Sequence, residues 1–147
     1  MDLTGLGASL AINAYRTLRL LVLKFTVERD RDDNYGPLCK LTRELRFIAG
    51  DNVLEELKLD VMVRLGASRR IESEDCSDVD SLLTEFGAFP MLHRVMVKIW
   101  WYLREDDGNG FSESLMEDKF PRLADSKAVE SNFFTEVYYE WITVMMV

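Results

Sequence analysis

One apolar pattern recurs three times at nearly constant spacing along this chain of 147 residues. It reads Leu-x-x-Leu-x-Leu-x-Phe-x-Val from Leu18, Leu-x-x-Leu-x-Leu-x-Val-x-Val from Leu54, and Leu-x-x-Val-x-Val-x-Ile-x-Trp from Leu92. The first leucines lie 36 and then 38 residues apart, which is typical of a structural repeat with one strand per unit. Because such a unit cannot bury its apolar face alone, we expect the units to stack on one another.

Helices are predicted between these strands. Apolar residues from Leu38 to Ile48 recur at helical spacing, Pro37 suits the first turn of that helix, and Gly50 suits its end. A variant of the capping box at residues 77–80 predicts a second helix over residues 78–86. We expect further helices within residues 1–16, from Leu3, Leu6, Leu10 and Tyr15, and from Ser112 to just before Pro121, with Leu115 and Met116 buried.

The alternation of strand and helix favours an α/β fold with parallel strands and right-handed connections. We expect a single domain over residues 1–147, an open solenoid with a curved sheet. Its three to four repeats would span approximately residues 1–36, 37–73, 74–110 and 111–147. The turns at Phe89-Pro90 and Phe120-Pro121 are expected to match, and a fourth strand is expected near residues 133–141, its register open.

The formal net charge of -8 is expected to repel nucleic acid and anionic membranes. The chain contains two cysteines, too few for a disulfide framework. We expect Cys39 to be buried on a helix and Cys76 to lie in an exposed polar loop over residues 64–76. The start of the chain lacks the pattern of a secretory signal, so we expect a cytoplasmic or nuclear protein.

Overlaying the three strands predicts which side chains face away from the core. If Leu21, Leu57 and Val95 are equivalent, the residues between the core positions share rows on the other face. The rows are Val22-Lys58-Met96, Lys24-Asp60-Lys98, Thr26-Met62-Trp100 and Glu28-Arg64-Tyr102. The charged rows predict ion pairs between neighbouring strands.

Residue types that anchor protein interfaces also gather on this face, namely Trp, Tyr, Met and Arg. We therefore expect a protein-binding surface there, although a C-terminal element could instead cover it. The candidate protein-binding residues are Lys24, Asp60, Met62, Arg64, Met96, Lys98, Trp100 and Tyr102.

Motifs for catalysis are not found, so no enzyme activity and no cofactor are expected. The segment Glu105–Gly110 resembles part of a calcium loop, but Met116 would occupy the position that requires a bidentate Glu. A polar turn is the preferred interpretation, and no metal site is predicted. His93, the single histidine, is expected to face solvent or to bond within a turn. The acidic residues Asp78 and Asp80 fit a helix start better than catalysis.

Leu18-Arg-Leu-Leu-Val-Leu23 and Leu54-Glu-Glu-Leu-Lys-Leu59 resemble long, irregular leucine-rich repeats. The helix over residues 78–86 followed by Phe89-Pro-Met-Leu-His-Arg-Val95 is similar to the C-terminal repeats of F-box-like proteins from mushroom-forming fungi. Phe120-Pro-Arg-Leu123 resembles the last such unit. The resemblance implies an intracellular leucine-rich-repeat-like solenoid that presents a repeat face to a target protein.

The expected function is therefore non-enzymatic protein–protein recognition, with an unknown partner. The sequence shows no F-box-like helical segment before the first repeat, so direct ligase recruitment is not expected. Two alternatives remain. The chain could be a repeat fragment that self-associates through its open ends, or a small ion-binding or enzymatic domain that uses Glu105–Gly110 or His93.

Overall fold

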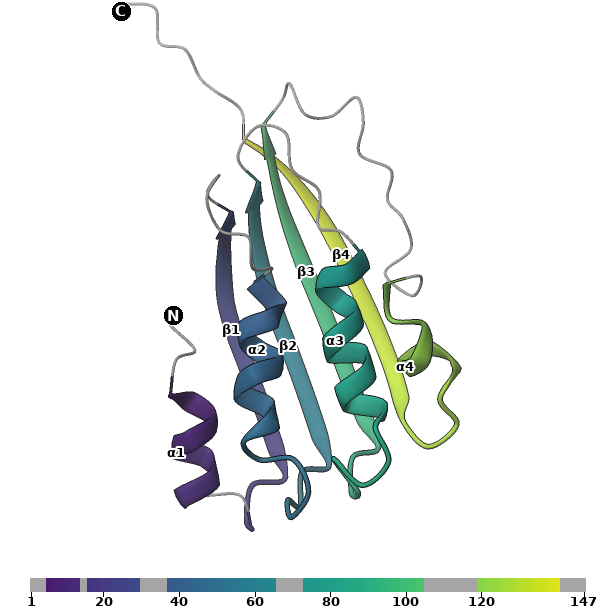
Figure 1. The fold of residues 1–147 in the computed structure, drawn as a ribbon. Helices are drawn as coiled ribbons and strands as arrows, with labels where there is room; N and C mark the ends of the chain where they lie inside the picture. The colour runs from purple at the N-terminus through teal and green to yellow at the C-terminus, as the bar shows by residue number, and fades with distance from the viewer. Residues whose placement is uncertain (1–4, 14–15, 30–36, 66–72, 105–118, 141–147) are drawn as a thin grey trace, which may run out of the picture.

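Helices and strands alternate along the whole described part of the chain. The computed structural model describes residues 5–13, 16–29, 37–65, 73–104 and 119–140. The elements are α1 (Leu6–Asn13), β1 (Leu20–Arg29), α2 (Pro37–Arg46), β2 (Glu56–Leu65), α3 (Ser73–Thr84), β3 (Arg94–Arg104), α4 (Pro121–Asp125) and β4 (Glu130–Glu140). The predicted α/β alternation is confirmed (Figure 1).

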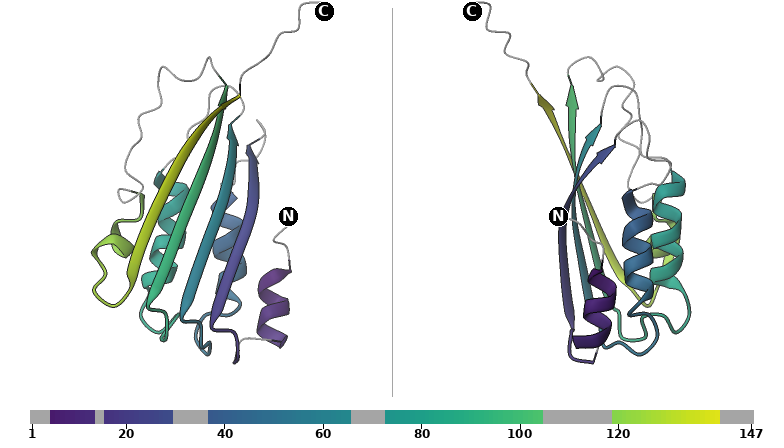
Figure 2. Two further views of the ribbon diagram at one scale, coloured as in Figure 1. Left: turned by 180° about the vertical axis from the view of Figure 1, so that it is seen from behind. Right: turned by 60° about the vertical axis from the view of Figure 1, so that its left-hand side comes forward.

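The four strands form one open sheet in the order β1-β2-β3-β4, and every neighbouring pair is parallel. Each strand follows a helix that lies on the same side of the sheet, and each connection is right-handed, as expected (Figure 1). Figure 2 shows the opposite side of the sheet, which no described helix covers.

The predicted strand register is confirmed. Leu21 pairs with Leu57, and Leu57 pairs with Val95, so the spacings of 36 and 38 residues carry over into the sheet. The fourth strand, expected near residues 133–141, begins earlier, at Glu130. Its register continues the pattern, because Phe133 pairs with Val97. The recurring leucines therefore mark equivalent positions of successive strands.

The core lies between the sheet and the helices. Alternate strand residues such as Leu57, Val95 and Ile99 are almost fully buried against apolar residues of α2 and α3. Burying a side chain of this size stabilises the fold by roughly 1.5–3 kcal/mol. At the β4 end, the rings of Phe120 and Phe133 stack with their centroids 5.5 Å apart. Alternation of buried and exposed residues leaves every second strand side chain on the other face of the sheet.

Two buried carboxylates join neighbouring helices. Glu44 in α2 accepts hydrogen bonds from the backbone N–H groups of Gly5 and Gly7 at the start of α1, at 3.4 and 2.8 Å. Asp80 in α3 accepts bonds from the N–H groups of Arg122 and Leu123 at the start of α4, at 3.0 and 2.8 Å. The expectation that Asp78 and Asp80 lie at the start of their own helix is wrong, because both lie inside α3 (Ser73–Thr84), and Asp80 instead caps the start of the neighbouring helix α4.

The predicted start of the second helix is wrong. Helix α3 begins at Ser73, so Ser77 lies inside it and does not cap it. Cys76 is consequently buried in the core and does not lie in an exposed loop. The acidic run before Ser77 suggested a loop, yet acidic residues also favour the positive end of a helix, and burial of Cys76 adds to that preference.

The expected match between the two Phe-Pro turns is also wrong. Pro90 lies in a turn, whereas Pro121 occupies the first turn of α4, a position that needs no backbone N–H. The expected helix from Ser112 lies outside the described residues, and so do the expected contributions of Leu3 and Tyr15 to the first helix. The surroundings of the Cys39 side chain also lie outside them. None of the helices in the described segments is long and apolar enough to cross a membrane.

Candidate protein-binding face of the sheet

The strand side chains that point away from the helices form what we term the open face. Its described side chains are Leu20, Val22, Lys24 and Thr26 of β1, Glu56, Lys58, Asp60 and Met62 of β2, Arg94, Met96, Lys98, Trp100 and Tyr102 of β3, and Glu130, Asn132, Phe134, Glu136 and Tyr138 of β4. All of them are exposed or half-buried. Parallel sheets are usually covered on both faces, so this open face is the unusual feature of the fold.

The structure brings the candidate residues together in the predicted rows. Lys24 pairs with Asp60 and Asp60 with Lys98, while Met62 pairs with Trp100 one row further on. Lys58 and Met96 share an earlier row. Arg64 and Tyr102 share the last of these rows, although the Arg64 side chain lies outside the described residues.

Trp100 is held in place by two charged neighbours. Its indole Nε1 donates a hydrogen bond of 2.6 Å to Oδ1 of Asp60 on β2. The Nζ of Lys98 lies 3.9 Å from the centre of the Trp100 ring, a cation–π contact. A tryptophan fixed in this way loses little conformational freedom when a partner binds, which favours its use as an anchor.

Three aromatic rings stack across β3 and β4. The Tyr138 ring lies 5.6 Å from that of Trp100 and 5.4 Å from that of Tyr102, with interplanar angles of 17° and 21°. We term these three residues the aromatic stack. Offset stacking contributes about 0.5–1.5 kcal/mol per pair beyond the burial of area. Tyr138 was not among the sequence candidates, because the register of β4 could not be fixed from the sequence.

A hollow of about 400 Å³ lies beside the aromatic stack. It is lined by Lys24, Phe25, Thr26, Asp60, Met62, Trp100 and Tyr102. The Thr26 hydroxyl lies 4.0 Å from the Met62 sulfur, where it can donate a weak hydrogen bond across the floor of the hollow. Five of the candidate residues therefore border one concavity.

The Tyr138 phenol donates a 2.7 Å hydrogen bond to Glu136 on the same strand. That bond raises the pKa of Tyr138 above its ordinary value, and desolvation and the Glu136 charge act in the same direction. The phenol therefore remains a neutral donor to a higher pH than a free tyrosine.

The predicted ion pairs along the row of Lys24, Asp60 and Lys98 do not form. Among the described residues, Asp60 bonds to Trp100 instead, and the Lys98 ammonium lies over that ring. The Glu28–Arg64 pair lies outside the described side chains. Residues in one row lie near one another in the sheet, but a long lysine side chain can also reach other neighbours. Lys98 reaches the Trp100 ring and does not pair with Asp60.

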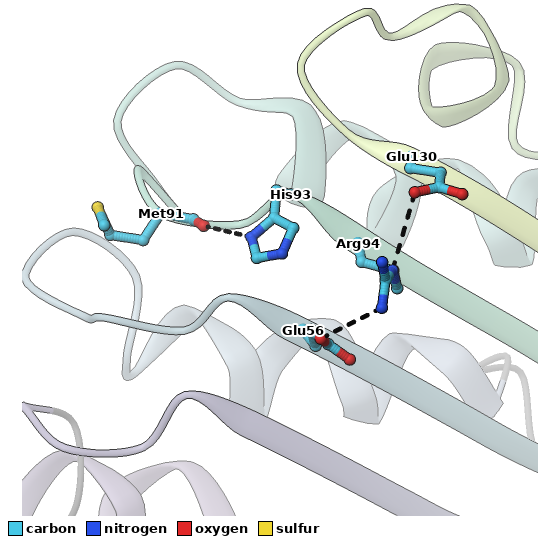
Figure 3. Close-up of polar contacts among 5 residues, drawn as sticks. All are labelled: Glu56, Met91, His93, Arg94 and Glu130. Carbon is cyan, nitrogen blue, oxygen red and sulfur yellow. Dashed lines mark hydrogen bonds and ion pairs between the residues drawn. The ribbon is translucent and has the colours of Figure 1, made fainter.

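Ion pairs form instead at the start of the strands. Arg94 lies between Glu56 and Glu130, at 3.4 and 3.8 Å, and so joins β2, β3 and β4 (Figure 3). The side chains of Arg94, Glu56 and Glu130 are 44%, 27% and 66% exposed, so each pair contributes about 0–1 kcal/mol. Arg94 was not predicted from the sequence, although its spacing of 38 residues from Glu56 is the spacing of the repeat.

His93 is exposed, and its Nδ1 lies 3.4 Å from the carbonyl oxygen of Met91 in the preceding turn (Figure 3). The expectation of a solvent-facing or turn-bonded side chain is confirmed. Within the described ranges, no three His, Cys, Asp or Glu residues are grouped so that they could hold a metal ion. The Glu105–Gly110 segment lies outside those ranges.

Comparisons of the chain with models of protein families, with curated proteins and with solved structures find no match.

Proposed function

We propose that the chain is a leucine-rich-repeat-like solenoid whose open face binds a partner protein. The observation that carries this proposal is the aromatic stack, with its fixed Trp100, beside a hollow on a face that no described helix covers. Aromatic side chains next to a concavity are the usual anchors of protein interfaces.

The solenoid part of the proposal is supported by contacts that repeat between successive units. The Arg19 carbonyl accepts the N–H of Glu56 at 2.9 Å, the Glu55 carbonyl accepts that of Arg94 at 3.2 Å, and the His93 carbonyl accepts that of Glu130 at 2.8 Å. Each unit thus bonds the next one at an equivalent position, as stacked repeats do. The buried Asn52 adds a side-chain link, because it donates to the Ala88 carbonyl at 2.8 Å.

The resemblance to repeats of fungal F-box-like proteins supports target recognition as the wider role. In that role the open face would select a substrate protein for an adaptor. Recovery of ubiquitin-ligase subunits together with the chain would support this part of the proposal, and their consistent absence would count against it.

Affinity capture with matched variants tests the proposed function. Thr26→Arg places a long side chain in the hollow and removes only the weak, exposed contact of the Thr26 hydroxyl with Met62, whereas Ala124→Arg adds an arginine on the exposed surface of α4. A binding partner should be retained by wild type and Ala124→Arg and lost by Thr26→Arg, and binding should be repeated with the purified partner. If Thr26→Arg, folded by its melting curve, retains every partner, binding through the open face is wrong.

A further inference from the structure

Resting on the proposed function, we propose that the open face binds an extended acidic segment of the partner protein. One apolar side chain of that segment would enter the hollow, and its carboxylates would pair with Lys24 and Lys58.

The first argument is the distribution of charge. Two adjacent rows of the open face, those of Val22 and Lys24, contain three lysines, Lys24, Lys58 and Lys98, and one acidic residue, Asp60. The acidic residues Glu56, Glu130 and Glu136 lie in the flanking rows. The chain as a whole has a formal net charge of -8. A locally basic stripe on an acidic protein favours an acidic partner segment at the stripe, because the overall negative charge disfavours such a segment elsewhere.

The second argument is that these charges are available. Within the described part of the chain, neither Lys24 nor Lys58 forms an ion pair, whereas Arg19, Arg46 and Arg94 do. Asp60, the acidic neighbour of both Lys24 and Lys98, is engaged by the Trp100 indole at 2.6 Å. The lysines therefore keep their charge for a carboxylate from outside the chain.

The third argument is the position of the hollow beside the stripe. Lys24 lines it together with the apolar atoms of Met62 and Trp100. Successive rows lie about 6.6–6.8 Å apart along a strand, because each row is two residues beyond the last. In an extended segment side chains two residues apart point to the same side at about this spacing, so an acidic and an apolar side chain at such positions can reach a lysine and the hollow together.

Single-stranded nucleic acid is the competing class, because it also combines negative charge with aromatic stacking. Several of the ring faces that base stacking would need are already engaged here. Lys98 lies over Trp100, and Tyr138 stacks on both Trp100 and Tyr102. The available edges and the Met62 side chain suit an apolar side chain better than a base.

Selection from a random twelve-residue peptide library displayed on phage tests the proposal. The baits are wild type, Lys24→Glu/Lys58→Glu, and the control Lys40→Glu/Lys127→Glu, which makes the same charge change at exposed sites off the open face. Wild type and the control should enrich peptides that contain several Asp or Glu residues and one large apolar residue. The open-face variant should bind the synthetic forms of these peptides at least tenfold more weakly, and added salt should weaken wild-type binding.

Two results would overturn the proposal. One is a wild-type selection that yields no binders or yields peptides without an acidic excess, and the other is equal binding of the selected peptides by the folded Lys24→Glu/Lys58→Glu variant. Tighter binding of a ten-nucleotide oligothymidine than of any selected peptide would overturn it in favour of nucleic acid. If one of these results is obtained while Thr26→Arg still fails to bind a partner that wild type captures, only the acidic character of the partner segment is wrong. The proposed function then stands.

Discussion

The indole Nε1 of Trp100 in β3 donates a 2.6 Å hydrogen bond to Oδ1 of Asp60 in β2, 40 residues earlier in the chain. The two residues belong to successive rows of the open face, so the bond crosses the sheet diagonally. It fixes the largest side chain of the candidate binding face without help from a helix. The rigidity of that face therefore depends on contacts between strand side chains.

Removing the carboxylate should uncouple this pair. Hydrogen bonds to charged groups contribute about 1.5–3 kcal/mol when buried, and partial exposure lowers the expected coupling between Asp60 and Trp100 to about 1 kcal/mol. A double-mutant cycle of Asp60→Ala and Trp100→Phe, followed by urea unfolding, measures this coupling. Asp60→Asn keeps a carbonyl acceptor and should destabilise less than Asp60→Ala. Additive effects of the two substitutions would show that the bond contributes nothing.

Asp80 should be the most sensitive acidic residue in the helical layer. Asp80→Ala leaves the N–H groups of Arg122 and Leu123 without their acceptor at a buried helix start, which should cost about 2–3 kcal/mol of unfolding free energy. The control Asp125→Ala removes an exposed carboxylate from α4, the helix that Asp80 caps, and should lower the free energy of unfolding by less than about 0.5 kcal/mol. Equal urea midpoints for the two variants would contradict the capping role.

Replacing the side-chain amide of Asn52 by a carboxylate should destabilise the fold. Its amide donates to the carbonyl oxygens of Ile48 and Ala88, both at 2.8 Å, and its own oxygen accepts the Leu54 N–H. Asn52→Asp keeps the size of the side chain but replaces the donating amide nitrogen by a carboxylate oxygen, which would face the carbonyl oxygens of Ile48 and Ala88. We therefore expect the free energy of unfolding to fall by about 2–3 kcal/mol. Asn132→Asp, on the half-buried open face, is the matched control and should lose far less in thermal unfolding. Similar losses of stability in both variants would argue against the side-chain link from Asn52 to the Ala88 carbonyl.

Glu136 should control the titration of Tyr138. The raised pKa means that the phenol–carboxylate bond is complete below the ordinary pKa of tyrosine and is lost as the pH rises through the raised value. Glu136→Gln should therefore lower the pKa of Tyr138 toward its ordinary value, and Glu130→Gln should not. Tyrosinate absorbance measures this shift when the titration of Tyr138→Phe is subtracted from that of each protein. An unchanged titration in Glu136→Gln would contradict the assignment.

The parallel sheet and the rows of its open face could be predicted from the sequence. Both follow from the alternation of apolar residues within each strand and from the nearly constant spacing between successive strands. Equivalence of Leu21, Leu57 and Val95 was enough to place Met62 beside Trp100. The sequence could not predict which row neighbours bond, since Asp60 has Lys24, Lys98 and Trp100 within reach and geometry decides among them.

Contacts between helices were missed for a related reason. Asp80 looks like a residue suited to the start of its own helix until packing places α4 beside it. The start of α3 was missed because acidic and polar residues around Ser73 are common in both loops and first helical turns. Burial of Cys76, which distinguishes the two, depends on the neighbouring elements.

Site-specific photo-crosslinking tests the central proposal, binding through the open face, most directly. A photoreactive amino acid replaces Thr26 on the open face in one protein and exposed Lys40 of α2 in the other. Irradiation in cells should attach a discrete protein to position 26 and not to position 40, and the crosslink should disappear with the added substitution Met62→Arg. A product at position 40 alone, or the same product at both positions, would contradict a binding site on the open face of the sheet.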